Sequence, residues 1–141
     1  MRITHGRQPR GALGKPRVKE YLHFMKATRI YADPQGVLHF ADFEVALEAG
    51  GEIGRLSSPL PGNRVIFRET EPSYDYDWHR PPQKQWIVLL DGEISIENGD
   101  GETRTFRGGN VLLMEDLHGR GHKTRQTSPG TRRSLFIPIS H

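Results

Sequence analysis

The sequence predicts an all-β protein, and three observations lead to that class. The 141 residues include 16 Gly and 10 Pro, about 18% of the chain against a typical total near 12%, which indicates many turns. Short apolar runs recur along the chain, each bounded by Gly, Pro, Asn or Asp. No window of about ten residues holds a convincing 3.6-residue apolar period, since Pro and Gly interrupt most of them. About ten short antiparallel strands in roughly 115 residues predict a β-sandwich or jelly roll.

The strand-like segments follow one another from residue 26 to residue 139. In order they cover residues 26–31, 37–47, 64–70, 74–79, 86–90, 93–97, 102–106, 111–114, 122–127 and 133–139. The first two are joined at Asp33-Pro34-Gln35-Gly36, where Pro presets φ and Gly accepts a positive φ. Residues 49–63 are rich in Gly, Ser and Pro, and we expect a loop there.

Two of the joints predict tight hairpins. Asp91 and Gly92 link the segment 86–90 to the segment 93–97. Asn98-Gly99-Asp100-Gly101 then lead into the segment 102–106. Both joints supply residues that tolerate the left-handed conformation, which two-residue and four-residue hairpin turns require.

The composition excludes several classes of protein. The longest uncharged apolar run, from Trp86 to Leu90, is far shorter than the roughly 20 residues that a membrane span needs. The chain holds no cysteine, which excludes disulfides, zinc ribbons, thiol nucleophiles and iron–sulfur clusters. His, carboxylate and amide oxygen remain as metal ligands. A cysteine-free chain without an export signal is expected in the cytoplasm, with no membrane partner.

The basic charge of the chain is confined to its N-terminal part. Residues 1–24 hold six of the 20 Lys and Arg residues and one of the 17 acidic residues, a net charge of +5. The remainder has 14 basic and 16 acidic residues, a net charge of −2. We interpret residues 1–24 as a basic, disordered extension and residues 25–141 as a single domain. Clustered Lys and Arg can contact phosphate backbones, but the mildly acidic domain predicts no nucleic-acid partner.

One stretch resembles the first signature motif of the cupin superfamily, which runs from a His-x-His pair through a Glu to a Gly. His79 matches the first His, and Pro81 stands where the second is expected. Gln85 takes the place of the Glu, and Gly92 lies the expected seven residues after it.

A second stretch resembles the other cupin motif, which runs from a Gly through a Pro-x-Gly turn to a His. Gly109 opens the motif, Gly119 is the turn glycine and His122 lies three residues after it, while Leu117 replaces the Pro. The resemblance extends from about residue 25 to residue 139. It implies the cupin double-stranded β-helix, a jelly-roll barrel, and it also suggests a small molecule inside the barrel and a homodimer.

The resemblance also implies a metal site. The positions at which the family binds its ion are held here by His79, Gln85 and His122, and the ion would be a divalent transition metal such as Fe, Mn, Ni or Zn. A neutral Gln in place of Glu should weaken affinity and leave the ion a stronger Lewis acid. Pro81, in place of the second His, opens a coordination position to substrate or water.

Strand alternation suggests which neighbours accompany these residues. If residues 74–79 are extended, Asp75, Asp77 and His79 share one face. The resemblance sends His79 inward, so Asp77 would also line the cavity. On the later strand, His122 shares its face with Thr124 and Gln126.

We therefore predict a metal-dependent enzyme with non-redox chemistry of isomerase, cyclase or lyase type, in which His79, His122 and Asp116 are the candidate catalytic residues. Two alternatives remain open. In one, the pocket binds a small molecule without metal. In the other, Asp77 or Asp116 completes a two-His, one-carboxylate set, as in non-haem iron oxygenases. Asp116 can also serve only to cap its own turn.

Other polar and aromatic residues are given structural interpretations. Trp86 is expected in the core or an interface, and Lys84 is expected as solvated surface charge. His39 has no partner suggested by spacing in the sequence.

Overall fold

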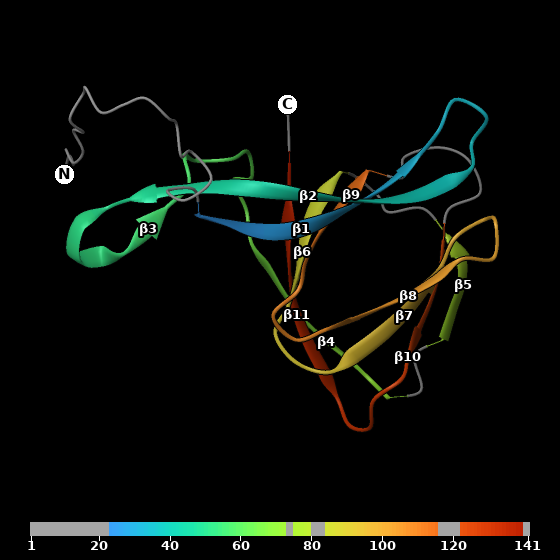
Figure 1. Cartoon of the computed structure of the whole chain (residues 1–141). Coiled ribbons are helices and arrows are strands. Elements are labelled where there is room, and N and C mark those ends of the chain that lie inside the picture. Colours follow the sequence, from blue (N-terminus) through green and yellow to red (C-terminus); the bar gives the residue numbers. More distant parts are fainter. Residues whose placement is uncertain (1–22, 73–74, 80–83, 116–121, 140–141) are drawn as a thin grey trace. The chain divides into compact units, whose positions relative to one another are not determined.

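The structure of the protein is a computed structural model that describes residues 23–72, 75–79, 84–115 and 122–139. Strands dominate these residues, with one short 3₁₀ helix among them (Figure 1). The elements are β1 (His23–Ala32), β2 (Leu38–Ala49), η2 (Gly51–Ile53), β3 (Arg55–Leu56), β4 (Ile66–Thr70), β5 (Asp75–His79), β6 (Gln85–Leu89), β7 (Glu93–Glu97), β8 (Thr103–Arg107), β9 (Val111–Glu115), β10 (His122–Gln126) and β11 (Arg132–Pro138). The predicted all-β class is confirmed. In the described part of the chain no helix is long and apolar enough to cross a membrane.

The chain divides into two compact units. The barrel unit comprises residues 27–43 and 61–141, and the ribbon unit comprises the residues up to 26 together with residues 44–60. β1 and β2 contribute residues to both units.

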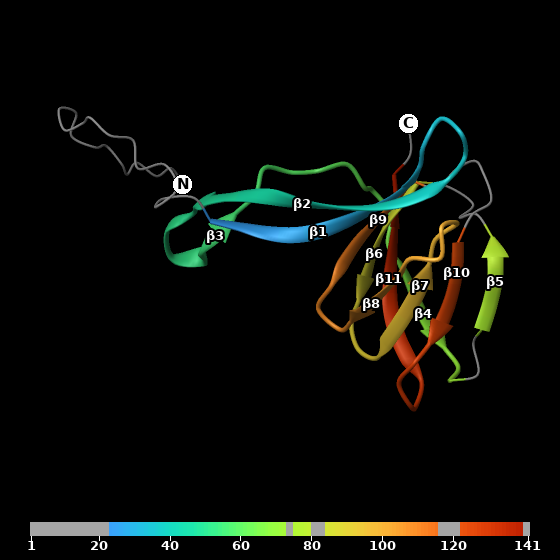
Figure 2. The same cartoon turned by 45° about the vertical axis from the view of Figure 1, so that its right-hand side comes forward.

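The barrel unit contains two sheets whose strands pair like the arms of one long hairpin. β7 pairs with β8, β6 with β9, β5 with β10 and β4 with β11, and all four pairs are antiparallel. The order is β9-β6-β11-β4 in the larger sheet, which β1 extends by pairing parallel to β9, and β5-β10-β7-β8 in the smaller sheet (Figure 2). Successive pairs thus alternate between the two sheets, which makes the unit a jelly roll, as the sequence predicted.

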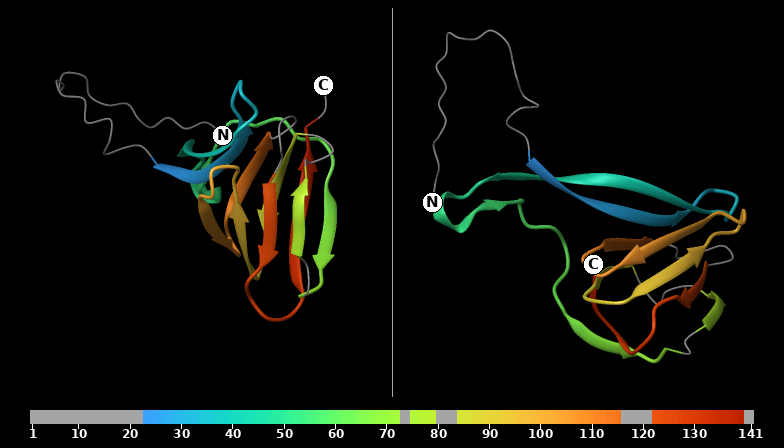
Figure 3. Two further views of the ribbon diagram at one scale, coloured as in Figure 1. Left: turned by 90° about the vertical axis from the view of Figure 1, so that its right-hand side faces the viewer. Right: turned by 60° about the horizontal axis from the view of Figure 1, so that its bottom comes forward.

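The two sheets of the barrel unit face each other (Figure 3), and residues of both sheets form one apolar core. The larger sheet supplies Leu89 and Leu112, and the smaller sheet supplies Ile94, Ile96 and Phe106. Along β7 the two isoleucines are buried while the residues between and beside them are half-buried. This two-residue period is the alternation that the sequence showed, with one face of the strand turned to the core.

The ribbon unit contains two elements in the segment expected to be a loop. β3 pairs with the end of β2, with Glu48 opposite Leu56 and Ala49 opposite Arg55. The reversal between them is built on glycine: the Gly50 N–H donates to Gly54 O at 2.6 Å, and Gly54 has a φ of +99°. Two paired residues leave no periodic signal in a sequence, which is why this short strand was not predicted.

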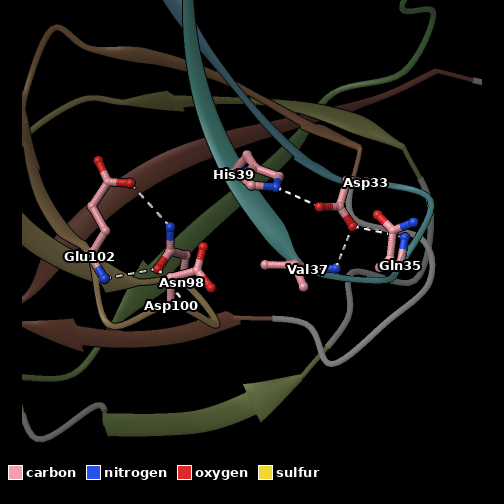
Figure 4. A network of polar contacts seen from close by, with 7 residues as sticks. All are labelled: Asp33, Gln35, Val37, His39, Asn98, Asp100 and Glu102. Carbon is pink, nitrogen blue, oxygen red and sulfur yellow. Dashed lines mark hydrogen bonds and ion pairs between the residues drawn. The ribbon is translucent and has the colours of Figure 1, made fainter.

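The predicted turns at residues 33–36 and 98–101 are both present (Figure 4). Asp33 Oδ1 accepts backbone N–H bonds from Gln35 and Val37, each at 2.9 Å. Asn98 is 1% exposed, and its Oδ1 accepts the N–H groups of Asp100 and Glu102, each at 2.9 Å. Both side chains therefore act as local substitutes for backbone acceptors, which is the usual role of Asx residues in turns.

Candidate functional site

The topology brings the three predicted metal ligands to one end of the barrel unit. His79 is the last residue of β5, Gln85 is the first of β6, and His122 is the first of β10. β5 and β10 are antiparallel neighbours (Figure 2), and His79 and His122 lie directly opposite each other in their register. Five residues separate the end of β5 from the start of β6, so all three positions belong to the same strand ends.

The β5–β10 ladder contains a register shift that strand alternation did not predict. Three steps from Tyr76 to His79 on β5 match two steps from Thr124 to His122 on β10, so β5 carries one additional residue. Alternation is therefore interrupted between Tyr76 and His79, and the sharing of one face by Asp77 and His79 stays a prediction. The side chains of β5 and of His122, and Asp116 as a whole, lie outside the described residues. Their roles in the site stay predictions.

Gln85 is buried on the inner side of the larger sheet. It is 3% exposed, and its register neighbours, Met114 on β9 and Pro138 on β11, are both buried. Gln85 therefore combines burial with a polar carboxamide, which is the combination expected of a residue that binds a ligand.

An ion cluster holds the strands around Gln85 together. Glu115, the last residue of β9, lies 2.9 Å from Lys84 Nζ and 2.5 Å from Arg29 Nε. The backbone carbonyl of Lys84 also accepts the N–H of Ile139 at 3.0 Å. These contacts join β1, the end of β9 and the residue before β6, at the end of the sheet where Gln85 opens β6. Lys84 is thus paired, in contrast to the solvated surface charge expected of it.

The charges of this cluster also set the ionisation of Glu115. Partial burial raises the pKa of its carboxyl, but hydrogen bonds from Lys84 and Arg29, together with their positive charges, outweigh burial. The pKa of Glu115 is therefore lowered from its ordinary value of 4.5. Sequence reasoning missed the cluster because its members are 31 and 86 residues from Glu115 along the chain.

A second polar cluster lies at the opposite strand ends. Arg132 is 2% exposed, and its Nε donates to Gln126 Oε1 at 3.3 Å. The Gln126 amide nitrogen in turn donates to the carbonyls of Ser128 and Gly130. This arrangement ties the turn between β10 and β11 to the barrel, which gives the cluster a structural role. Ser134, two residues from Arg132 on β11, lies opposite Leu89, which is four positions or about 13 Å along β6 from Gln85.

Two further buried hydroxyls stand near this end. Thr70 Oγ1 and Ser134 Oγ have no hydrogen-bond partner among the residues described.

Two other side chains differ from or refine their sequence interpretation. His39 does have a partner: its Nε2 lies 2.7 Å from Asp33 Oδ2 (Figure 4). This bond, with those from the backbone of Val37 and Gln35, holds the pKa of Asp33 below its ordinary value of 3.8. Trp86 is half-buried, its indole donates to the Pro61 carbonyl at 2.8 Å and its ring lies beside that of Phe43.

Where side chains are described, no group of three or more His, Asp and Glu residues is arranged to hold a metal ion. The two predicted histidine ligands fall outside that description, and an amide ligand such as Gln85 is not among those residue types. The ligand set therefore stays a prediction. The observations in its favour are the strand topology and the burial of Gln85.

The barrel unit has a jelly-roll fold, with the strand pairing described above. Neither protein-family models nor curated proteins match the sequence. Among solved structures, the Schizosaccharomyces pombe Cnp3 cupin domain is similar at 8% identity and a TM-score of 0.41, over 84% of each chain. A protein assigned as Salmonella typhimurium ethanolamine utilization protein Q is similar at 16% identity and a TM-score of 0.38, over 83% of this chain and 97% of that one.

A third similar structure is assigned as a mannose-6-phosphate isomerase of Ralstonia eutropha. Its identity is 18% and its TM-score is 0.36, over 83% of this chain and 86% of that one. Likenesses this distant carry no argument about the ligand or the reaction of this chain.

Proposed function

We propose that this protein is a metal-dependent cupin enzyme that carries out non-redox chemistry on a small organic molecule. The site would lie where β5 ends and β6 and β10 begin. The observation that carries the proposal is the burial of Gln85 at the strand ends that also carry the register-paired His79 and His122. Two imidazoles and an amide oxygen form a neutral donor set suited to a divalent transition ion such as Fe, Mn, Ni or Zn.

The donor set and its surroundings favour isomerisation, cyclisation or elimination. A divalent ion bound by three neutral ligands keeps its full charge and would supply Lewis acidity toward a carbonyl or enolisable oxygen. Asp116 follows β9 directly at the same strand ends, and in this proposal it takes and returns a proton. The Lys84–Glu115–Arg29 cluster holds the start of β6 against the end of β9, so it fixes the position of Gln85.

The proposal extends to compartment and partners. The net charge of −2 over residues 25–141 favours a small-molecule substrate over a nucleic acid. The absence of cysteine suits a reducing compartment, and we propose the cytoplasm. A homodimer is proposed as the working form.

Elemental analysis of the full chain, purified without a histidine tag or added metal, tests the metal site. We expect about one transition metal per chain, lost in His79→Ala and in His122→Ala and reduced in Gln85→Ala. His39→Ala is the matched control, because His39 pairs with Asp33 and is not one of the proposed ligands, so its loss should leave the metal content unchanged.

A second readout separates the alternatives. Addition of Mn, Fe, Ni or Zn to metal-stripped protein should raise the unfolding temperature of the wild type but not of His79→Ala. Metal-free protein with no thermal shift would overturn the metal site and leave a pocket that binds small molecules without an ion. Loss of metal in His39→Ala to the same extent would show that the loss reports unfolding rather than ligation.

A further inference from the structure

The turn between β7 and β8 holds a dipeptide that can react with itself. Of the three asparagines in the chain, only Asn98 is followed by glycine. Glycine has no Cβ, so its backbone nitrogen can approach the preceding carboxamide carbon closely. When the Gly99 nitrogen attacks Asn98 Cγ, an N–C bond forms, the Cγ–Nδ2 bond breaks, and the proton of the Gly99 nitrogen leaves with the amide as ammonia. Water then opens the cyclic imide to aspartate or isoaspartate.

The folded turn holds the Asn98 carboxamide by both of its polar atoms (Figure 4). Its Oδ1 accepts the backbone N–H groups of Asp100 and Glu102, each at 2.9 Å, and its Nδ2 donates to Glu102 Oε1 at 3.1 Å. The backbone is held as well, because the Asn98 N–H donates to the Glu102 carbonyl at 2.9 Å. A five-membered imide requires its own ψ and χ1 at Asn98, so closing the ring breaks these bonds.

Burial adds to this protection. Asn98 is 1% exposed, so water does not reach its carboxamide while the turn is closed. The turn between β1 and β2 lies against the same dipeptide, since a Cβ on Gly99 would stand 3.9 Å from Val37 Cγ1 and 4.0 Å from the Leu38 nitrogen. Ring closure and the hydrolysis that follows therefore both depend on opening of this turn.

The products of the reaction fit the closed turn poorly. An aspartate at position 98 would place a carboxylate oxygen where Nδ2 now lies, 3.1 Å from the Glu102 carboxylate. Two negative charges would then face each other at a position that is 1% exposed, which disfavours the closed turn. Isoaspartate would instead lengthen the backbone within the turn. Either product opposes the hairpin that joins β7 and β8.

We propose that Asn98-Gly99 is a site of spontaneous deamidation that the native fold protects. In the folded chain the amide is retained, whereas in an unfolded chain it is lost as ammonia. The product opposes re-formation of the turn, so a chain that stays unfolded becomes marked and less able to refold. This inference rests on the turn alone and is independent of the metal site.

Peptide mass spectrometry tests the protection. The full chain is incubated at one mildly alkaline pH, folded in buffer and unfolded in guanidinium chloride, and conversion at residue 98 is followed with time. We expect conversion to be at least roughly tenfold faster in the unfolded chain, because the folded turn has to open first. Equal rates in the two states would overturn the proposal.

Gly99→Ala tests the attacking nitrogen. Gly99 does not have a positive φ, and a Cβ there would make ordinary contact with Val37, so this variant should keep the turn. Because the added Cβ hinders the attack, we expect conversion at residue 98 in guanidinium chloride to slow by roughly tenfold or more. Conversion at the wild-type rate would mean that the Gly99 nitrogen does not attack and would overturn the mechanism.

Glu102 variants test the hydrogen bond to Nδ2 in the folded chain. Glu102→Ala removes the acceptor and should speed conversion by roughly threefold to tenfold, the effect of losing one such bond, whereas Glu102→Gln keeps an acceptor oxygen and should match the wild type. Glu93→Ala is the matched control, because it removes an ion pair with Arg107 at the other end of the same hairpin. Equal acceleration by Glu93→Ala and Glu102→Ala, or none by Glu102→Ala, would contradict protection by this bond.

Asn98→Asp tests the effect of the product, because it installs the aspartate directly. We expect it to lower the folding equilibrium constant at neutral pH by roughly tenfold or more. Asn110→Asp is the matched control: Asn110 is exposed and uses its Oδ1 to accept the Arg107 N–H at 2.8 Å, a bond that a carboxylate oxygen can replace. Equal effects of the two variants in urea denaturation would contradict the role given to the buried charge.

Discussion

The barrel unit and the ribbon unit are built from the same kind of strands, yet only one of them buries side chains. β2 passes through both: Leu38 is 2% exposed in the barrel unit, whereas Leu47 is only half-buried in the ribbon unit. In the barrel unit a second sheet covers the inner face of the first, so alternating residues enter a common core. In the ribbon unit no such layer is described. The comparison shows that an alternating sequence pattern is enough to specify an extended strand. The stability of that strand depends on whether another layer covers its apolar face.

Matched leucine truncations give the largest expected effect. Leu112→Ala removes a side chain that is 1% exposed in the core of the barrel, and we expect it to lower the free energy of unfolding by about 2–5 kcal/mol. Leu56→Ala, at 49% exposure in the ribbon, should cost less than about 0.5 kcal/mol. Urea denaturation of both variants checks the comparison. Equal losses would mean that the ribbon has a core that the exposure values do not show.

Two left-handed glycines sharpen the comparison at the level of the backbone. Gly92 has a φ of +76°, and a Cβ there would lie 2.9 Å from Arg132 Cγ, so Gly92→Ala meets both strain and a clash. We expect a loss of roughly 2–4 kcal/mol. Gly54 has a φ of +99° with open space around it, so Gly54→Ala adds strain without a clash. Its cost should be about 1–2 kcal/mol and fall on the ribbon.

Thermal unfolding followed by near-ultraviolet circular dichroism, which reports packed aromatic rings, measures the glycine variants. A midpoint shift for Gly54→Ala as large as that for Gly92→Ala would show that the two units unfold as one.

The jelly roll followed from the sequence because its determinants are local. The period of two in β7 and the turn residues at Asp33 and Asn98 each act within a few positions of the chain. Neither β3 nor the additional residue in β5 could be predicted in this way. The first rests on only two paired residues, and the second is fixed by the register of a strand more than 40 residues away.

The candidate site was predictable only in part, for the same physical reason. Resemblance to known motifs pointed to Gln85, whose burial on the inner face agrees with a site role. The Lys84–Glu115–Arg29 cluster had no sequence signal, because its charges come from three strands that meet only after folding. A motif within one strand or turn can be predicted from the sequence. The groups that hold it in place come from distant parts of the chain and cannot be predicted in this way.

The smallest expected effect concerns that cluster and its dependence on pH. Glu115→Gln removes a carboxylate bonded to Lys84 and Arg29, and because both partners are partly exposed we expect a loss of about 1 kcal/mol near neutral pH. The folded-state pKa of Glu115 lies below the ordinary value of 4.5, so its contribution is present above pH 4.5 and is lost as the pH falls through the lowered pKa. The free energies of unfolding of the wild type and Glu115→Gln should therefore converge below pH 4.5.

Glu48→Gln replaces an exposed glutamate of the ribbon unit and is the matched control. The difference in free energy of unfolding between this variant and the wild type should stay constant across the pH range. Urea denaturation of the three proteins between pH 3 and pH 7 tests this, and a constant gap for Glu115→Gln across that range would contradict the role assigned to the cluster.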